Sequence, residues 1–182
     1  MGQSGSGKST LVKYLSSHMG FPRICTVTTR PKRADETSAD YEFVSAETFN
    51  ELTDIICVRN YLTYIEGAPM VHRYGLHKQS VQDGGLLISD FGGYKELLGM
   101  SQDNLVGIFM NTSYETCLQR AKNRTDFNEK EFIRRFEVDR ESLNTEFLSD
   151  YAKLFPIYFI NGDLSLSDVV DQFKEVLREV SI

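Results

Sequence analysis

Residues 1–10 read MGQSGSGKST, and the stretch from Gly2 to Ser9 fits the spacing GxxxxGK followed by Ser or Thr. In a loop of this kind, backbone amides surround the phosphates of a nucleotide, and the glycines permit a tight turn close to them. The segment that follows, residues 8–20, has apolar residues at helical spacing and ends on Gly20. The stretch therefore predicts a phosphate-binding loop at the N-terminus of a helix, where the helix dipole favours an anion.

Two side chains of the loop have specific expected roles. Lys8 is placed to meet the phosphoryl group that is transferred, and the Ser9 hydroxyl is placed to ligate Mg²⁺. The residues expected to bind the triphosphate are Gly2, Gly5, Ser6, Gly7, Lys8, Ser9 and Thr10. Because the pattern holds both the lysine and the serine and opens a helix, it favours a nucleoside triphosphate together with Mg²⁺.

Only Met1 precedes the loop, whereas such a loop normally follows a buried strand. That strand is central in the expected sheet, and its loss would expose the edges of the neighbouring strands. We therefore expect roughly five to eight residues of apolar strand before Met1 in the natural protein, a common strand length. A truncated or mis-started chain, whose function depends on residues upstream, is an open alternative.

Composition and charge exclude several classes of protein. The chain has 182 residues, of which 41% are hydrophobic and 25% charged, as in an ordinary globular domain. No apolar run has the length of a membrane span and no signal-peptide pattern is present, so we expect a cytoplasmic protein without a membrane partner. The net charge of −6 disfavours a nucleic-acid partner. Three cysteines without a CxxC pair and three histidines without metal-ligand spacing predict neither a disulfide framework nor a structural metal.

Strand-like and helical segments alternate along the chain. Strands are predicted at residues 24–29, 40–44, 86–89, 105–110 and 155–160, and helices at 8–20, 46–52, 77–85 and 113–124, with a long helix after Asn128 and a closing helix through Val180. This alternation favours an α/β fold whose mainly parallel sheet is covered by helices on both faces. Ligands of such folds bind at the carboxyl ends of the strands, and Asp90 lies at one of these ends.

Several segments, in order along the chain, resemble the guanylate kinase family. Residues 26–45, TVTTRPKRADETSADYEFVS, are similar to the TTR step, second arginine, acidic residue and Asp-Tyr pair of that family. Further similar segments are YGLHKQSV (74–81), LLISDFGG (86–93), LQRAKNR (118–124), IRRF (133–136) and FINGDL (159–164). The resemblance covers nearly the whole chain. It implies a P-loop kinase fold with a core at 1–39 and 85–182, a monophosphate-binding lobe at about 40–84, and a helical lid at about 120–140 within the core.

The same resemblance implies phosphoryl transfer from ATP to a nucleoside monophosphate, with GMP converted to GDP. It assigns acceptor binding to Thr26, Arg30, Arg33, Tyr41, Tyr74 and Asp90, and catalysis to Lys8 with the lid residues Arg120, Arg124 and Arg135. Arginines on both sides suit the chemistry, since the reaction joins two polyanions. Beside the lid residue Arg135, Arg134 is expected to be the solvated neighbour, since adjacent helical residues point in different directions. The alternative for the lid arginines is that they form ion pairs on the helix surface, such as Glu131 with Arg135. Asn161 is assigned to the adenine base, although an asparagine before glycine also serves as a turn former.

Part of the base-reading set departs from the family. Thr63 stands where the family has an acidic residue that pairs with the guanine edge, and Leu76 where it has a small hydroxyl residue. Ile88 replaces the first of two acidic residues on the strand segment, and Glu66 is a candidate substitute for the missing carboxylate. Losing a charged hydrogen-bond partner costs about 1.5–3 kcal/mol, enough to blur or shift the base preference.

Two other functions remain open. One is a kinase for a different small phosphate acceptor, which would share the loop and the arginines but not the base contacts. The other is a non-catalytic guanylate kinase-like module that binds proteins. Such modules have degraded phosphate loops, whereas Gly7, Lys8 and Ser9 are intact here. The expected partners are therefore small-molecule nucleotides, and a homodimer is a possible assembly.

Overall fold

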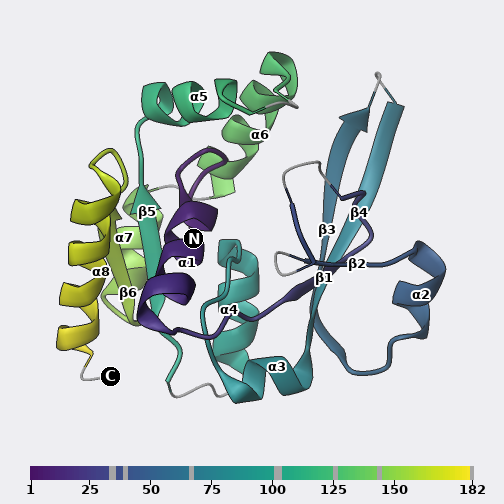
Figure 1. Ribbon diagram of the computed structural model, residues 1–182, viewed down its shortest axis with the longest axis horizontal. Coiled ribbons are helices and arrows are strands. Elements are labelled where there is room, and N and C mark those ends of the chain that lie inside the picture. The colour runs from purple at the N-terminus through teal and green to yellow at the C-terminus, as the bar shows by residue number, and fades with distance from the viewer. Residues whose placement is uncertain are drawn as a thin grey trace. The chain divides into compact units, whose positions relative to one another are not determined.

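The computed structural model describes residues 1–32, 36–38, 41–65, 68–100, 104–124, 127–142 and 145–180. The chain combines helices and strands, so it has the α/β class that the sequence predicts. Its contacts define two compact units (Figure 1). Unit 1 comprises Met1–Met19 and Ile88–Ile182, and unit 2 comprises Gly20–Leu87.

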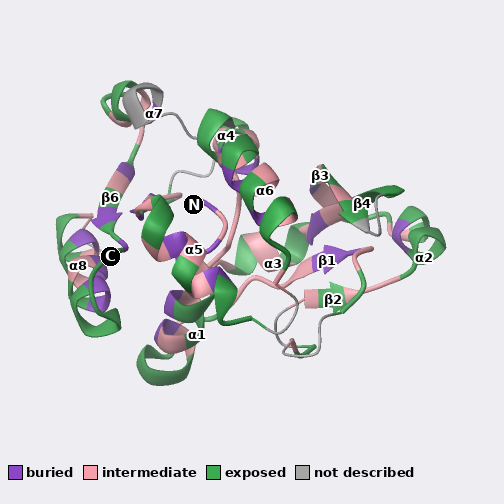
Figure 2. Cartoon of the chain, turned by 90° about the horizontal axis from the view of Figure 1, so that it is seen from above, coloured by how far each residue is buried: buried purple, intermediate pink, exposed green. Residues whose placement is uncertain are grey.

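Unit 1 is built on two parallel strands, β5 (Gly107–Asn111) and β6 (Ile157–Asn161), paired in register from Gly107↔Ile157 to Asn111↔Asn161. Its helices are α1 (Lys8–Met19), α4 (Phe91–Gly99), α5 (Tyr114–Lys122), α6 (Glu129–Ser142), α7 (Thr145–Ala152) and α8 (Leu166–Glu179). Helices α4 and α7 lie on one side of the strand pair, and α1 and α8 lie on the other (Figures 1 and 2). Each face of the pair is therefore covered.

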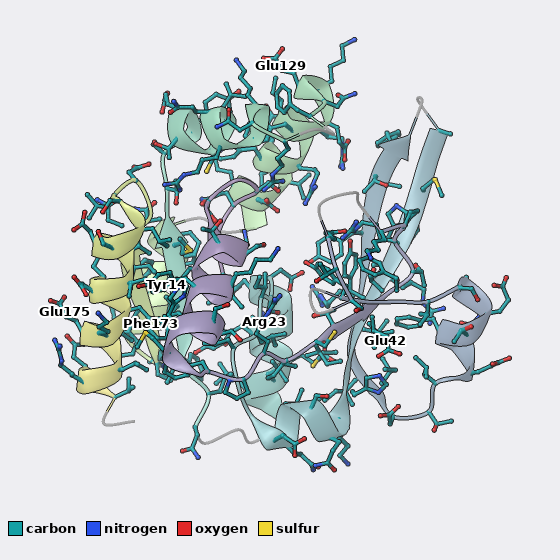
Figure 3. The ribbon with its side chains drawn as sticks, viewed as in Figure 1. Tyr14, Arg23, Glu42, Glu129, Phe173 and Glu175 are labelled. Atoms are coloured by element: carbon teal, nitrogen blue, oxygen red, sulfur yellow. The ribbon has the colours of Figure 1, made fainter. Side chains whose placement is uncertain are left out.

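Buried side chains of β5 and β6 form the core of unit 1 with the helices beside them. Phe109 on β5 is fully buried and packs with residues of α4, α7 and β6. On the other side, α8 packs on β6 and α1 through an apolar stripe, and its outer side faces solvent (Figure 2). Figure 3 shows Phe173 on the inner side of α8 and Glu175 on its outer side, which is the expected result of helical periodicity.

Met1 continues this sheet at the edge of β5 that β6 does not use. Its amino nitrogen donates to Ile108 O at 2.6 Å, and Met110 N donates to Met1 O at 2.9 Å. These two bonds flank Phe109, as in a parallel ladder. On the opposite edge, Gly107 N donates to Pro156 O at 2.7 Å. The phosphate loop therefore begins directly from a ladder position beside β5, while the strand expected before Met1 stays a prediction.

Unit 2 is a four-stranded sheet of order β2-β1-β4-β3 with two short helices. Its elements are β1 (Thr26–Thr28), β2 (Tyr41–Phe43), α2 (Ala46–Glu51), β3 (Ile55–Ile65), β4 (Ala68–His77) and α3 (Lys78–Asp83). Strands β1 and β2 are parallel, whereas β1/β4 and β3/β4 are antiparallel. Helix α2 packs near the sheet through Phe49, which is buried and approaches Gly75 of β4.

Local signals in the sequence are confirmed at several element ends. The Ser45 hydroxyl accepts from Thr48 N and caps α2, and Gly84 follows α3 with a φ of 78°. The Asn128 side chain accepts from Glu131 N at 3.0 Å at the start of α6. Ser45 and Asn128 each accept a hydrogen bond from a free N–H group at a helix start, and Gly84 adopts the positive φ at which the chain leaves a helix.

Three expectations differ from the structure. The sheet of unit 2 is mixed rather than mainly parallel, because the long β3/β4 pair contributes antiparallel strands. Residues 86–89 form no strand. Leu86 makes a single β-bridge to Arg23, and the pairing goes no further because unit 2 ends at the next residue. The long helix after Asn128 is divided into α6 and α7, and residues 143–144 lie outside the described part. Helix α4, which begins with two glycines after Phe91, was not predicted.

None of the helices in the described residues has the length and apolar character that crossing a bilayer requires. The longest, α6 and α8, have 14 residues each, and a span needs about 20.

The core of unit 1 can be tested with two phenylalanines on neighbouring strands. Replacing Phe109, which is 0% exposed, by Ala leaves a cavity and lowers the free energy of unfolding by about 3–5 kcal/mol. The matched control is Phe159→Ala, because Phe159 is 39% exposed and its ring contacts that of Phe109. Urea denaturation should show the larger loss for Phe109→Ala. Equal losses in the two variants would contradict the assigned core.

Candidate functional site

The phosphate loop of unit 1 lies tightly against β5 and α5. Gly2, Gly5 and Gly7 have φ values of 142°, 87° and 101°, which side-chain-bearing residues rarely adopt. A Cβ on Gly5 would lie 2.5 Å from Cys117 O on α5, and one on Gly2 would lie 2.8 Å from Met110 O on β5. Glycine is therefore required at these positions both for the turn and for the close approach.

Ser6 is the point at which the loop is anchored. This residue is fully buried, and its amide donates to Gln3 O at 3.1 Å. Its carbonyl oxygen accepts from Arg120 Nη1 at 3.0 Å and from Thr112 Oγ1 at 3.3 Å. The expected lid residue Arg120 is therefore in direct contact with the phosphate loop.

Lys8 is folded back over its own loop. Its Nζ donates to Gly2 O at 2.7 Å, to Gln3 O at 2.8 Å and to Ser6 Oγ at 3.3 Å. Burial lowers the pKa of Lys8 to about 8, against the opposing effect of the Asp139 carboxylate.

Two of the expected lid arginines lie within electrostatic reach of Lys8. The positive charges of Arg135 and Arg124 lower the pKa of Lys8 further. The structure therefore brings Lys8, Arg124 and Arg135 together in unit 1, with Arg120 bonded to the loop beside them. A cluster of this kind, without a ligand, repels itself, and an oxyanion would relieve that repulsion.

Helix α6 has an ion pair between Glu131 and Arg134, and not the pair between Glu131 and Arg135 that the alternative predicts. Glu131 accepts from Arg134 Nε and Nη2, both at 2.8 Å, in a two-pronged contact. No described carboxylate forms an ion pair with the half-buried Arg135. Since adjacent helical residues point in different directions, Arg134 takes the surface pair and Arg135 faces the charges of the loop.

The first turn of α1 has groups suited to a triphosphate and Mg²⁺. The helix begins with Leu11 N donating to Gly7 O at 3.0 Å, so the amides before Leu11 lie at the open end of the helix. Ser9 and Thr10 are exposed there. A hydroxyl oxygen is a hard ligand that Mg²⁺ accepts, so the donor set at Ser9 fits the ion that the sequence predicts.

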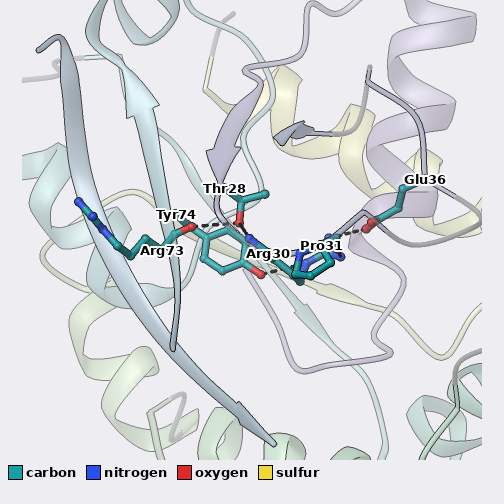
Figure 4. A network of polar contacts seen from close by, with 6 residues as sticks. All are labelled: Thr28, Arg30, Pro31, Glu36, Arg73 and Tyr74. Atoms are coloured by element: carbon teal, nitrogen blue, oxygen red, sulfur yellow. Dashed lines mark hydrogen bonds and ion pairs between the residues drawn. The ribbon is translucent and has the colours of Figure 1, made fainter. Parts of the chain in front are cut away.

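In unit 2, Arg30 is the centre of a polar network (Figure 4). Its Nε donates to Tyr74 OH at 3.1 Å, its Nη2 to Glu36 Oε1 at 2.6 Å, and its Nη1 to Pro31 O at 2.8 Å. Arg30 N donates to Thr28 Oγ1 at 3.1 Å, which fixes the start of the loop on β1. The guanidinium is thus held in a defined place by backbone and side chains alike.

The Arg30–Glu36 pair is largely shielded from water. Both side chains are 11% exposed, and the guanidinium carbon lies 5.3 Å from the centre of the Tyr41 ring. Burial lowers the pKa of Arg30, but the hydrogen bond from Arg30 to Glu36 and the nearby Tyr74 outweigh it, and the pKa is raised. Arg30 is therefore a permanent cation that already holds an oxyanion, the carboxylate of Glu36.

One face of the unit 2 sheet collects most of the expected acceptor residues. Thr26 of β1 pairs with Leu76 of β4 and with Tyr41 of β2, and the rings of Tyr41 and Tyr74 meet edge to face at 6.3 Å. Thr63 lies farther along β3, where its hydroxyl donates to Met70 O at 3.5 Å. Leu76, which stands where the family has a small hydroxyl residue, is only 5% exposed and belongs to the apolar core.

The remaining expected residues have local structural roles or lie outside the described part. Arg33 and Glu66 are not among the described residues. Asp90 caps α4, with Oδ1 accepting from Gly93 N at 2.6 Å. The Asn161 side chain accepts from Asp163 N at 2.9 Å, as the turn-forming alternative predicts. The site roles of Asp90 and Asn161 stay predictions.

Two polar residues near these groups were missed by the sequence analysis. Asp139 on α6 accepts from Ser4 N and Ser4 Oγ of the phosphate loop, and His72 of β4 is 3% exposed. Burial lowers the pKa of His72, and the charge of Arg30 lowers it further. Neither lies in a motif. Only the spacing of Asp139, four residues after Arg135, could have placed it on the same helix face.

Comparison with solved structures identifies a similar fold. The crystal structure of guanylate kinase from Anaplasma phagocytophilum matches 98% of this chain and 82% of its own, with a TM-score of 0.58 and 20% sequence identity. No protein-family model matches the chain, and no curated protein matches its sequence. The chain therefore has a guanylate kinase-like fold.

Titration of Lys8 tests the electrostatics of the loop. With a pKa of about 8, its amine should lose half its charge near pH 8 rather than near the usual value of about 10.4. The unfolded chain then binds more protons between these values, so the free energy of unfolding rises with pH across this window. NMR of isotopically labelled lysine side chains would measure the pKa, and a value near 10 would contradict the burial of the amine.

Proposed function

We propose that the chain, with its guanylate kinase-like fold, transfers a phosphoryl group from ATP to a nucleoside monophosphate in the presence of Mg²⁺. GMP is the first acceptor that we assign, with GDP as the product. The observation that carries the proposal is the half-buried Lys8, whose amine lies on the carbonyl oxygens of an intact glycine loop, with Arg120, Arg124 and Arg135 near it. A concentration of positive charge around a loop of backbone amides suits a polyphosphate better than any neutral ligand.

The donor half belongs to unit 1. The amides of the loop and of the first turn of α1 would bind the ATP phosphates, and Lys8 would leave the carbonyl oxygens of Gly2 and Gln3 for a phosphate oxygen. When bound at Ser9, Mg²⁺ supplies further charge neutralisation to the phosphates. Arg124 and Arg135, on the proposed lid at about 120–140, would balance the negative charge that moves during transfer.

The acceptor half belongs to unit 2. Arg30, fixed by Tyr74, would hold the monophosphate in place of the Glu36 carboxylate, with Tyr41 at the side of the guanidinium. Arg33, from the same loop, is proposed as its partner on that phosphate. An arginine suits this role because its planar donors match a phosphate in two-pronged contacts. We propose that the part of unit 2 at about 40–84 is the monophosphate-binding lobe, with Arg30 and Arg33 on the chain that leads into it.

The base-reading residues support a second candidate, a kinase for another small phosphate acceptor. Leu76 is buried opposite Thr26, and Thr63 bonds to a backbone carbonyl of the neighbouring strand. Neither supplies the charged partner that would read a guanine edge. The Arg30 clamp does not depend on these two residues, so a phosphate can be held while the base is read loosely.

A panel of acceptors tests the proposed reaction directly. ADP release from ATP and Mg²⁺ should be fastest with GMP among GMP, dGMP, AMP, CMP and UMP, because the fold resembles that of a guanylate kinase, whereas the Arg30 clamp would hold the phosphate of any of them. Lys8→Ala should lower kcat by on the order of 100-fold or more, since it removes a cation from the transferred phosphoryl. Circular dichroism must show that the variant is folded. Turnover with none of these acceptors would contradict the proposed reaction, and turnover of a different phosphorylated compound would favour the second candidate.

The acceptor clamp is tested by Arg30→Met. Removing a charged contact of about 1.5–3 kcal/mol should raise KM for GMP roughly tenfold to a hundredfold, with KM for ATP unchanged. Lys32→Met is the matched control, because Lys32 is an exposed cation in the same loop. Equal effects of the two variants on KM for GMP would show that general charge, rather than the clamp, holds the acceptor.

A further inference from the structure

We propose that Asp139 is an internal anion that occupies the phosphate loop while no nucleotide is bound, and that a triphosphate must displace it. Asp139 would then set the affinity of the loop for nucleotide. The inference rests on the proposed function, because it takes the loop as the site of the ATP phosphates.

The first support is the contact itself. Asp139 Oδ2 accepts from Ser4 N at 2.7 Å and from Ser4 Oγ at 2.8 Å. Ser4 lies between Gly2 and Gly7, so its amide belongs to the set that a phosphate-binding loop offers to an oxyanion. A carboxylate on this amide makes the same charge-assisted hydrogen bond that a phosphate oxygen would make. Carboxylate and phosphate therefore compete for one donor.

The second support is the charge of the loop. The Lys8 amine lies on the loop, where it donates to Gly2 O and Gln3 O, and Asp139 is the strongest of the nearby charges that favour its protonated form. Asp139 thus supplies, in the absence of a ligand, the negative charge that Lys8 and the neighbouring arginines need. A triphosphate brings a larger negative charge to the same place. The two anions repel each other, so both cannot remain against Ser4.

The third support is the position of Asp139 on α6. Asp139 follows Arg135 by four residues, so the two side chains lie on the same face of the helix, about one turn apart. Lys8 attracts Asp139 and repels Arg135 when the loop is empty. A bound triphosphate reverses both forces. Replacement of Asp139 by a triphosphate would therefore free Ser4 and draw Arg135 toward the phosphates. Nucleotide binding would in this way be coupled to movement of α6.

The test compares Asp139→Asn with Glu137→Gln in the full chain. Glu137 is an exposed carboxylate on the same helix, so the control removes the same charge without the contact to Ser4. Asparagine keeps the shape and one acceptor but loses the charge. Because a charged hydrogen bond is stronger than a neutral one, we expect Kd for ATP, by calorimetry, to fall about tenfold in Asp139→Asn, which corresponds to about 1.4 kcal/mol. Glu137→Gln should leave Kd within about twofold of the parent protein.

A second measurement follows the Ser4 amide by NMR. We expect its proton to lie far downfield in the free protein, to move upfield in Asp139→Asn, and to respond to ATP in both. An unchanged or weaker affinity for ATP in a folded Asp139→Asn, or a Ser4 amide that does not move, would overturn the inference alone. Tighter ATP binding in Asp139→Asn without turnover of any monophosphate would support the inference and contradict the proposed reaction. Absence of ATP binding in all three proteins would overturn both.

Discussion

The close approach of the phosphate loop to β5 and α5 is the constraint on which unit 1 depends. Gly5 lies so near Cys117 O, and Gly2 so near Met110 O, that no Cβ fits at either position. The contact buries Ser6 and lets Arg120 and Thr112 share its carbonyl oxygen. Because β5 is hydrogen-bonded to Met1 on one edge and to β6 on the other, the strand that the loop packs against is held in place. The loop can then present its amides in one direction, which is the condition for binding an oxyanion without a large loss of entropy.

The chain places one of its own carboxylates at each of the two positions where we propose that a phosphate binds. In unit 1 the carboxylate of Asp139 lies on Ser4, and in unit 2 that of Glu36 lies on Arg30. Buried or half-buried cations are costly without a partner, so an internal carboxylate stabilises each unit in the absence of substrate. Because this carboxylate contact must be broken, the net free energy gained by a phosphate that replaces the carboxylate would be smaller. Under the proposed function, phosphate binding at each position would be an exchange of anions, and its strength would depend on the difference between a carboxylate and a phosphate.

Local chemistry in the sequence was sufficient for many elements. Ser45, Gly84 and Asn128 mark helix ends because each meets a requirement of the adjoining backbone alone. Residues 86–89 were mispredicted as a strand, since an apolar run does not reveal whether neighbouring strands extend beside it. The long antiparallel pair of β3 and β4 was missed for the opposite reason. Its exposed and half-buried residues follow no clear alternation, and a bulge between Ile56 and Arg59 shifts the register.

The sequence by itself determined the tight glycine turn at residues 2–7 and the helix that follows it, because these are encoded in contiguous residues with fixed spacing. The binding roles of the arginines came from the family resemblance and stay predictions. Only the tertiary structure decided that the Lys8 amine folds back onto Gly2 O and Gln3 O, that Arg134 rather than Arg135 pairs with Glu131, and that Asp139 reaches Ser4. Ser4 and Asp139 are separated by 135 positions in the chain. Hydrogen bonds and charges act over a few ångströms of space, and the distance between such residues is set by the packing of α5 and α6 around the loop, which no local pattern records.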